Sequence, residues 1–560
     1  MITLGIADNH DSGAALVVDG QLVAAINQER IDRIKGSSAF PWGAIDAVLS
    51  EAKVSARQVD HIVVGTAFTP SALLRLLPQQ HQTAKSTGQF SSALHGYMVY
   101  QSLLQKLGAH AIEYSLCHRI LNRKLRARPF EHAQLHLMDH HQAHAEAAYR
   151  TQARDRILVL TLDAMGDGRS ATAWLGDNGQ LTPLWSQSGL AAINLFYSRI
   201  TEIIGFKPLR HEGKITGLAA YATPPDELMA QFRSQLKYEN GRFKRMPIFT
   251  PAKANDRFWN ALTSYSKEEI ASAAQAILEE VTLDYVRYWL KRTQTTHLAV
   301  AGGVFANVKL NQRIAELSEL ESLWVLPHMG DGGLAAGGAL GFQKSAPKQM
   351  NTAYLGPSYP ENDAFRALKR IKVERNKQDS LLRAAQCLAE GGVIARCKGR
   401  MEWGPRALGN RTIFATPNDP EINNRLNARL QRTEFMPFAP IVREEDATRY
   451  FIGLEKANEA ARFMTVCFNV TPEFQKNCPA AVHVDGTARP QVLRREDNPE
   501  VHTLLGMVGE LTGTPVLINT SFNMHEEPIV CTADEGVKAW NQAGLEGLLI
   551  GAYFAEPTKN

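Results

Sequence analysis

The chain has 560 residues and a formal net charge of +4 at pH 7, and 44% of its residues are hydrophobic. This length exceeds what one hydrophobic core usually serves, and the small charge argues against a general nucleic-acid surface, so we expect a globular protein of two or more domains that binds no nucleic acid. Six cysteines without a C-x-x-C pair, and no apolar run of membrane-spanning length, predict a cytoplasmic protein with reduced thiols and no membrane partner.

The first predicted elements form a strand and a hairpin. A strand over residues 2–7 is followed by a polar turn and by a hairpin over residues 14–26, whose Asp19-Gly20 pair is a strong turn signal. The same order of strand, polar glycine turn and returning hairpin recurs at residues 157–184. Two copies of one unit predict two similar lobes, as in the actin/Hsp70/sugar-kinase superfamily. Two unrelated hairpins are the alternative.

Residues 68–134 are predicted to be mostly helical, and they include a basic run. The favoured interpretation of this run is a solvated helix face, and the alternative is a rim for an anionic or acceptor substrate. Its residues are Arg119, Arg123, Lys124, Arg126 and Arg128.

The segment from residue 139 to 168 predicts a metal site. His140 and His144 are four residues apart in a helical pattern, so both imidazoles would lie on one helix face, as when a helix offers two nitrogens to one metal ion. Asp163 ends an apolar, strand-like run and would add a carboxylate. The alternative is that the histidines are core or capping groups, and His141 would point elsewhere on the helix.

Lys214 is predicted to be a catalytic group. Glycines flank this lone lysine in the run EGKITG, and they indicate a backbone bend that would aim the ammonium into a cleft. Residues 266–293 have the pattern of an amphipathic helix, and Ser266 and Glu269 form a possible capping box at its start. This helix is expected to act as a scaffold.

Residues 297–312 read as a strand, a glycine turn and a helix. Gly302 and Gly303 would let a nucleotide approach the backbone, and the helix that starts near Asn307 would favour an anion. A second glycine turn holds Asp331, which could be the fourth ligand of the predicted metal site. The alternative for Asp331 is a helix N-cap.

Taken together, the motifs resemble the NodU/CmcH family of O-carbamoyltransferases, which includes TobZ-like enzymes, over nearly the whole chain. The segments that carry the resemblance are, in order, HDSGAALVVDG, DHHQAHAEAAY, LDAMGDG, EGKITGLAAYA, AGGVFANVKLN, MGDGG, GRMEWGPRALGNR, EFMPFAP, HVDGTARPQ and NTSFNMHEEPIV.

The resemblance implies an α/β protein of two domains. Residues 1–345 would form a two-lobed domain of the actin/Hsp70/sugar-kinase type, like the universal tRNA threonylcarbamoyl-transferase (TsaD-like). Residues 353–560 would form a YrdC-like domain that makes an acyl-adenylate. The polar linker at residues 344–351 fits this boundary. By the same resemblance, His10 takes the place of a catalytic histidine, and the metal, often iron, is bound by His140, His144, Asp163 and Asp331.

The second domain carries candidate phosphate-binding residues. Its arginines, interleaved with glycines, suit polyphosphate or carbamoyl phosphate, and structural ion pairing is the alternative. Ser521 and Asn523 resemble the YrdC nucleotide motif. The cationic candidates are Lys398, Arg400, Arg406, Arg432 and Arg489.

One departure from the family pattern concerns the donor site. Many members carry K-x-R-E-x-F-R-P-F-A-P, and the lysine position here is Gln431. Arg429 or Arg432 would then supply the missing charge. A second departure is the run from His525 to Glu527, where a glycine often precedes the last glutamate.

The resemblance implies a reaction in two steps. Carbamoyl phosphate and ATP, with Mg²⁺, would give carbamoyl-AMP in the second domain, because an anhydride with AMP supplies a good leaving group. The carbamoyl group would then pass to a hydroxyl of a small-molecule acceptor, a natural product or sugar, beside Fe²⁺, Zn²⁺ or Mn²⁺, with His10 as general base. The protein would be a monomer or homodimer. A threonylcarbamoyl-type tRNA modification enzyme and a non-catalytic ATP-binding regulator are the alternatives.

Overall fold

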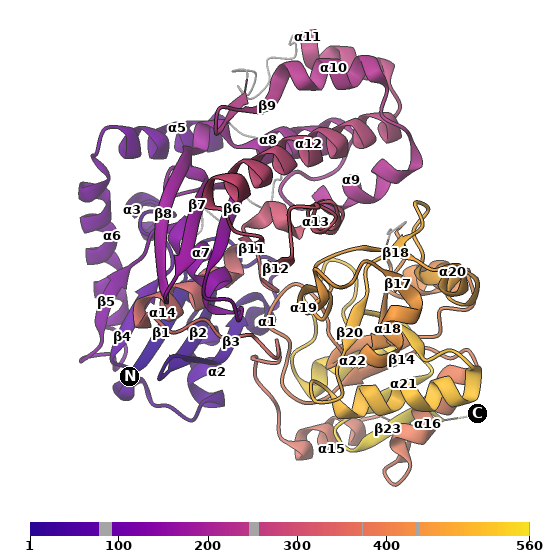
Figure 1. Ribbon diagram of the computed structural model, residues 1–560. Coiled ribbons are helices and arrows are strands. Elements are labelled where there is room, and N and C mark those ends of the chain that lie inside the picture. Colours follow the sequence, from indigo (N-terminus) through magenta and orange to yellow (C-terminus); the bar gives the residue numbers. More distant parts are fainter. Residues whose placement is uncertain (78–91, 246–256, 372, 433–435, 559–560) are drawn as a thin grey trace. The chain divides into compact units, whose positions relative to one another are not determined.

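The computed structural model describes residues 1–77, 92–245, 257–371, 373–432 and 436–558 (Figure 1). The chain divides into two compact units. The first comprises Met1–Leu22, Ser38–Pro41 and Val54–Gln349, and the second comprises Val23–Ser37, Trp42–Lys53 and Met350–Asn560. Two short N-terminal segments are thus grouped with the second unit, whereas the sequence assigned all of residues 1–345 to the first domain.

Two five-stranded sheets of matching topology form the core of the first unit, although most of β3 (Gln21–Asn27) is grouped with the second unit. Their strand orders are β3-β2-β1-β4-β5 and β8-β7-β6-β11-β12. In each sheet the first strand in chain order pairs antiparallel with the next strand and parallel with a later one. In the first sheet β1 pairs in this way with β2 and β4, and in the second sheet β6 pairs with β7 and β11. The predicted duplication is therefore confirmed, and with it the two-lobed α/β fold of the actin/Hsp70/sugar-kinase type.

The strands of the first sheet are β1 (Ile2–Ala7), β2 (Gly13–Val18), β3 (Gln21–Asn27), β4 (His61–Val64) and β5 (Gln134–Leu137). Those of the second are β6 (Ile157–Gly166), β7 (Arg169–Asp177), β8 (Gln180–Ser188), β11 (His297–Ala301) and β12 (Ser322–Val325). A small hairpin joins β9 (Leu236–Glu239) to β10 (Arg242–Arg245).

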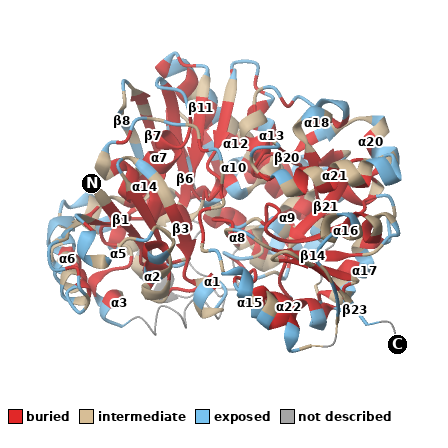
Figure 2. Ribbon diagram, turned by 90° about the horizontal axis from the view of Figure 1, so that it is seen from below, coloured by how far each residue is buried: buried red, intermediate tan, exposed pale blue. Residues whose placement is uncertain are grey.

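Two helices pack against each other between the sheets. The helix α14 (Leu334–Gln343) contacts β1, β2 and β4, and α7 (His140–Arg150) contacts β6, β7 and β11 (Figure 1). Close approach depends on glycine, because a Cβ at Gly337 would lie 1.8 Å from the carbonyl oxygen of Ala143. Both helices are almost entirely buried (Figure 2). Their packing therefore holds in place the start of α7 and the turn that precedes α14.

The other helices of the first unit cover the outside of this core. The long helix α12 (Lys267–Thr293) starts at the predicted capping box of Ser266 and Glu269, which is confirmed. Lys214 lies within a regular helix, so the predicted backbone bend is wrong. The bounds of the covering helices are α3 (Ala72–Leu76), α5 (Ser92–Lys106), α6 (His110–Leu125), α8 (Ile193–Ile203), α9 (Glu212–Leu218), α10 (Asp226–Gln235), α11 (Arg257–Ala261) and α13 (Val308–Ala315).

The second unit is built on a mixed eight-stranded sheet with helices on both faces. Its order is β13-β23-β22-β14-β15-β21-β16-β20. The helices α15 (Glu361–Lys369) and α22 (Ala533–Ala543) pack over one hydrophobic cluster, and α16 (Ser380–Ala389) and α21 (Pro499–Thr512) pack over another. The strands are β13 (Val373–Asn376), β14 (Ile394–Cys397), β15 (Arg411–Ala415), β16 (Ala439–Arg443), β20 (Gln491–Leu493), β21 (Val516–Ser521), β22 (Gly547–Ile550) and β23 (Tyr553–Pro557).

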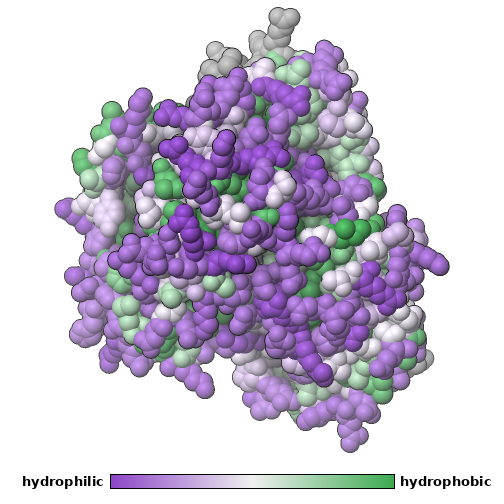
Figure 3. Space-filling model, in the orientation of Figure 1, coloured by the Kyte–Doolittle hydropathy of each residue, from purple (hydrophilic) through white to green (hydrophobic). Residues whose placement is uncertain are grey.

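The helices of this unit are α1 (Glu29–Asp32), α2 (Trp42–Glu51), α15 (Glu361–Lys369), α16 (Ser380–Ala389), α17 (Ile422–Arg429), α18 (Glu444–Tyr450), α19 (Asn458–Ala461), α20 (Pro472–Asn477), α21 (Pro499–Thr512) and α22 (Ala533–Ala543). A three-stranded sheet joins β17 (Phe451–Ile452), β18 (Phe468–Val470) and β19 (Thr487–Ala488). Most of the surface seen in Figure 3 is hydrophilic, and none of the described helices is both long and apolar enough to cross a bilayer.

Candidate functional site

Two histidines are presented by the first turns of α7. The Asp139 side chain caps this helix by accepting a hydrogen bond from the Gln142 N–H at 3.0 Å, so the helix begins at His140. His140 and His144 consequently lie on one helix face, as the sequence predicted. Both side chains are buried, with at most 1% of their surface exposed. His141 points away and lies 2.7 Å from Thr161 Oγ1 through its Nδ1.

Asp163 enters the same space from β6. The register of β6 with β7 shifts between Leu162 and Gly166, and such an irregularity redirects the side chains within it. The carboxylate accepts a hydrogen bond from the Gly303 N–H at 3.2 Å and lies 3.1 Å from His144 Nε2. Burial alone would raise the pKa of Asp163, but the two histidines outweigh it and hold the pKa well below its ordinary range.

Asp331 completes the set from the turn that precedes α14. Its Oδ1 lies 3.6 Å from His140 Nε2 and 3.5 Å from His144 Nε2. Its Oδ2 accepts a hydrogen bond from Asn9 Nδ2 at 2.6 Å and lies 3.2 Å from His10 Nδ1. The Asp331 side chain caps no helix, so the N-cap alternative does not apply.

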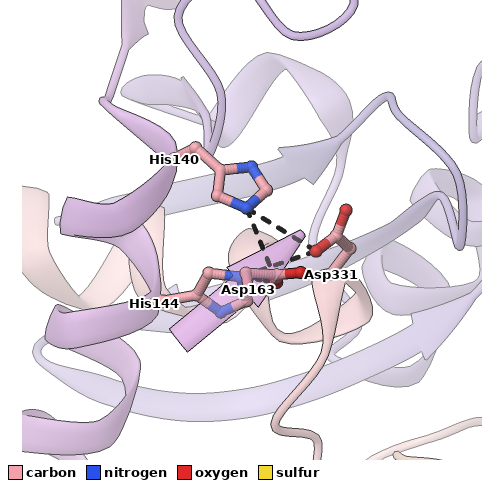
Figure 4. Close-up of side chains that lie close together, drawn as sticks. All are labelled: His140, His144, Asp163 and Asp331. Carbon is pink, nitrogen blue, oxygen red and sulfur yellow. Dashed lines mark hydrogen bonds and ion pairs between the residues drawn. The ribbon is translucent and has the colours of Figure 1, made fainter. Parts of the chain in front are cut away.

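The four side chains point toward one another (Figure 4). One ligand atom from each of His140, His144, Asp163 and Asp331 lies within 4.8 Å of the others. Both ring nitrogens of His140, and Nδ1 of His144, are buried without a hydrogen-bond partner in the described structure. Two imidazoles and two carboxylates suit a divalent transition metal with further open positions, so these residues fit the metal that the sequence implied.

The charge balance of this set favours a cation. Burial alone would lower the pKa of His140, but the carboxylates of Asp331 and Asp163 outweigh it and raise the pKa to about 9. The two carboxylates therefore retain a proton on the neighbouring imidazole, a place that a divalent ion would fill with more charge.

Sequence reasoning missed the residues that hold this set in place. The buried carboxylate of Asp167 accepts hydrogen bonds of 2.8 Å from the backbone N–H groups of Ala67, Phe68 and His140, and so ties the start of α7 to the loop after β4. Gly166 lies against the His140 ring, where an added Cβ would come within 2.1 Å of Cγ. The motif Gly166-Asp167-Gly168 after the strand was the available signal, but its partners are set only by the tertiary fold.

His10 lies at the edge of the set. Its side chain is 47% exposed, and its Nδ1 faces Asp331 Oδ2. Asp331 thus faces the histidines of α7 through one oxygen and His10 through the other. This contact orients the His10 ring through Nδ1.

The remaining residues predicted for the first unit have structural partners. A Cβ at Gly302 would lie 2.3 Å from the carbonyl oxygen of Leu162, so strand packing alone explains this glycine. Asn307 caps α13 by accepting a hydrogen bond from Leu310 N–H. The Lys214 ammonium lies 5.7 Å from the centre of the Phe206 ring. Binding or catalytic roles for these residues and Gly303 stay predictions.

In the second unit, two of the predicted phosphate-binding cations form internal contacts. Lys398 pairs with Glu500, which also binds Arg396 at 2.7 Å. Arg400 donates hydrogen bonds to three backbone carbonyls and lies 3.2 Å from Glu51. These contacts match the alternative of structural ion pairing.

The segment around Ser521 and Asn523 is organised by Arg432. This guanidinium donates to Thr520 Oγ1 at 3.0 Å, to the Ser521 carbonyl at 2.8 Å and to Asn523 Oδ1 at 3.0 Å. Arg429 instead forms a bidentate pair with Glu546, with both contacts at 2.8 Å. Of the two arginines proposed to replace the missing lysine at Gln431, only Arg432 therefore contacts the predicted nucleotide segment. Residues 433–435 lie outside the described part.

Arg406 and Arg489 differ from the other cations of this unit. The Nε atom of each is buried without a hydrogen-bond partner, and neither forms an ion pair with any described residue. Burial, and to a smaller extent the charge of Arg489, lowers the pKa of Arg406. Two such cations favour binding of an anion with several oxygens, such as a phosphate.

Glu402 shapes the loop that carries Arg406. Its buried Oε1 accepts hydrogen bonds from the backbone N–H groups of Leu408, Asn410 and Arg411, at 2.9, 2.7 and 3.1 Å. No sequence motif indicated this role, because the three donors belong to the backbone. The loop is thereby held in one conformation around the arginine.

Comparisons with known proteins identify related chains. A family model described as Carbamoyltransferase N-terminus matches residues 2–340, and one described as Carbamoyltransferase C-terminus matches residues 385–556. Nodulation protein NolNO of Sinorhizobium fredii is 31% identical over 97% of this chain and 78% of its own length. Nodulation protein U of the same organism is 26% identical over 94% of each chain. The crystal structure of T. kodakarensis HypF aligns over 61% of this chain and 47% of its own, with 12% identity and a TM-score of 0.32.

Proposed function

The chain belongs to the carbamoyltransferase family and is a carbamoyltransferase; from this premise we propose that it activates carbamoyl phosphate with ATP and transfers the carbamoyl group to a hydroxyl of a small-molecule acceptor. Activation is assigned to the second unit and transfer to the first. The acceptor class follows from the chemistry of an O-carbamoyltransferase, a natural product or a sugar.

In the first step, carbamoyl phosphate and water give carbamate and phosphate. A carbamate oxygen then attacks the α-phosphorus of ATP, and the bond to the bridging oxygen of pyrophosphate breaks, which yields carbamoyl-AMP. Arg406 and Arg489 would neutralise the phosphate charges, since two preorganised cations stabilise the charge that develops on the leaving group. Mg²⁺ would accompany ATP.

In the second step, the acceptor hydroxyl attacks the carbamoyl carbon and AMP leaves. We assign to His10 the removal of the hydroxyl proton, which its second ring nitrogen would accept while Asp331 holds the first. His140, His144, Asp163 and Asp331 would hold a divalent metal, Fe²⁺ or else Zn²⁺ or Mn²⁺, which supplies Lewis acidity when bound. Asn9 fixes the Asp331 carboxylate by its 2.6 Å hydrogen bond.

The observation that carries this proposal is the position of Asp331. One carboxylate faces the ligand set through Oδ1 and an exposed histidine through Oδ2. A structural histidine cluster has no need of a solvent-accessible base at its rim. A binding site for metal alone would not require one either.

The activation step can be tested by pyrophosphate–ATP exchange. Labelled pyrophosphate should enter ATP only when carbamoyl phosphate is present, and Arg489→Ala should abolish the exchange. Arg425→Ala, which removes an exposed arginine paired with Asp419 at 2.8 Å, should leave it unchanged. Exchange without carbamoyl phosphate, or full exchange in Arg489→Ala, would disprove the assignment.

A further inference from the structure

The hairpin of α5 and α6 presents an unusual number of exposed apolar side chains. Leu107 is 74% exposed and Ile112 70%, on either side of the turn between the helices. Leu103 and Leu116, each one helical turn further from it, are 45% and 43% exposed. Single exposed leucines are common, but a group of four around one turn indicates a contact surface.

Exposed cations continue this surface along α6. Ile112, Leu116, Arg119, Arg123 and Arg126 follow one another at intervals of four, three, four and three residues, and therefore lie on one stripe of the helix. The three arginines are exposed and form no ion pair with any described residue. Lys106, at the end of α5, is exposed beside Leu107. We define the α5–α6 face by these residues together with Leu103.

Negative charge is nearly absent from this part of the chain. Between residues 92 and 130 the sequence holds a single acidic residue, Glu113. Glu113 is 6% exposed and turned inward, since it accepts hydrogen bonds from the Ala72 N–H at 2.6 Å and from the Tyr100 hydroxyl at 3.0 Å. The face thus combines protruding apolar groups with uncompensated positive charge, and hydrophobic atoms are visible over α5 and α6 at the left of Figure 3.

We propose that the α5–α6 face docks on an anionic phospholipid surface. Apolar side chains at the turn would enter the boundary between headgroups and acyl chains, while Lys106 and the arginines of α6 would bind lipid phosphates. The sequence predicted no membrane partner because no segment is long enough to span a bilayer. Peripheral docking needs only such a face.

The charge and shape of the α5–α6 face favour a lipid surface over a second copy of the chain, an acidic protein or a nucleic acid. A second copy of the chain, bound through the same face, would set like charges against like charges. An acidic protein would satisfy the arginines, but it would need pockets for the protruding leucines. A fluid lipid surface accepts convex apolar groups without a matching shape. Nucleic acid would use the cations and leave the apolar group without a role.

The test is cosedimentation of the full chain with vesicles of phosphatidylcholine alone or with about one third phosphatidylglycerol. We expect binding only to the anionic vesicles, with loss at high salt. Arg119→Glu/Arg123→Glu/Arg126→Glu should weaken binding at least about 100-fold, because each basic residue near an anionic surface contributes about a fivefold factor. Leu107→Ser/Ile112→Ser should weaken it about tenfold.

The control variant Arg366→Glu/Lys369→Glu/Lys377→Glu makes the same charge change on exposed residues of the second unit, and it should bind like the wild type. Circular dichroism and pyrophosphate exchange verify the fold of each variant. Three results would overturn the proposal: no binding to anionic vesicles, equal loss in the control variant, or displacement from vesicles by an oligonucleotide that binds the same arginines more tightly.

Discussion

The ligand set of the first unit and the arginines Arg406 and Arg489 of the second unit are opposite in charge. They are alike because the described residues do not fully balance the charge of either. Two buried carboxylates face two histidines in the first unit, and Arg406 and Arg489 of the second unit form no ion pair with any described residue. Other charged side chains in the two units form direct ion pairs, such as Arg75 with Asp8 at 2.8 Å and Arg429 with Glu546. The histidines balance the two carboxylates only in part, and no described acid pairs with Arg406 or Arg489, so a ligand of the opposite charge would stabilise either site.

The difference between the two sites lies in how each is assembled. Asp331 and Asp163 receive backbone and side-chain hydrogen bonds that fix each oxygen. Arg406 and Arg489 have no such donors or acceptors, and only the loop that carries Arg406 is fixed, by Glu402. The first site is thus preorganised atom by atom, while the second is preorganised through its backbone.

The largest effect is expected for Asp163→Ala. It removes one of two carboxylates from the ligand set, so the bound metal should be lost and carbamoyl transfer should fall by more than about 100-fold. Metal content of the purified variant is measured by mass spectrometry. Asp177→Ala makes the same charge change at a half-exposed pair with Arg156 and should keep the metal. Full metal content in Asp163→Ala would refute the ligand assignment.

Metal affinity should also depend on pH. Because the pKa of His140 is raised to about 9 in the metal-free protein, a metal must displace its proton at any lower pH. Apparent affinity should therefore fall about tenfold for each pH unit below about 9. Competition with a chelator dye at several pH values measures this slope. A flat profile between pH 7 and pH 9 would show that His140 is not a ligand (roughly two logarithmic units are expected across this range).

Arg406→Met should separate binding from stability. It removes the charge of a half-buried arginine whose Nε atom has no hydrogen-bond partner, so the unliganded protein should melt at the same temperature or higher. Stabilisation of the wild type by pyrophosphate should be lost, with an affinity about 100-fold weaker. Thermal melts with and without pyrophosphate check both parts. Destabilisation of the unliganded protein would mean that Arg406 has a structural partner after all.

A smaller effect is expected for Asn9→Ala. This change deletes the hydrogen bond to Asp331 Oδ2 but leaves all four ligands in place. Loss of such a supporting contact should weaken metal binding about tenfold. Titration of the metal-free variant measures it, and Asn9→Asp, which adds charge but no donor, should not restore affinity. Unchanged affinity would show that the carboxylate is fixed by other contacts.

The smallest effect belongs to Lys398→Ala. The sequence named this residue as a phosphate ligand, but its ammonium pairs with Glu500 in the structure. A partly exposed pair of this kind contributes little, so pyrophosphate exchange should stay within about threefold of the wild type. A loss as large as that of Arg489→Ala would remove the distinction between paired and unpaired cations.

The sequence predicted the first site better than the second for a physical reason. Helical periodicity places His140 and His144 on one face, and a strand end and a glycine turn position the two aspartates, so local rules suffice. The duplicated hairpins likewise follow from local turn signals, and both sheets contain the predicted strand and hairpin. The motif resemblance then joined the four residues into one set.

The second site could not be resolved in this way. Lys398, Arg400 and Arg406 look alike in sequence, and their roles differ only because Glu500 and Glu51 come from distant segments to pair with two of them. The helical backbone at Lys214 was missed because the flanking glycines suggested a bend, whereas packing of α9 against α12 overrides their low helix propensity. Pairing across long sequence separations is a tertiary property.

The most direct test of the two-site account is a single-turnover experiment with ATP, labelled carbamoyl phosphate and a panel of hydroxyl acceptors, quenched and analysed by mass spectrometry. His10→Ala should form carbamoyl-AMP at the wild-type rate and fail to carbamoylate any acceptor that the wild type modifies. Arg406→Ala should form neither product. Loss of carbamoyl-AMP in His10→Ala, or its normal formation in Arg406→Ala, would contradict the division of the reaction between the two sites.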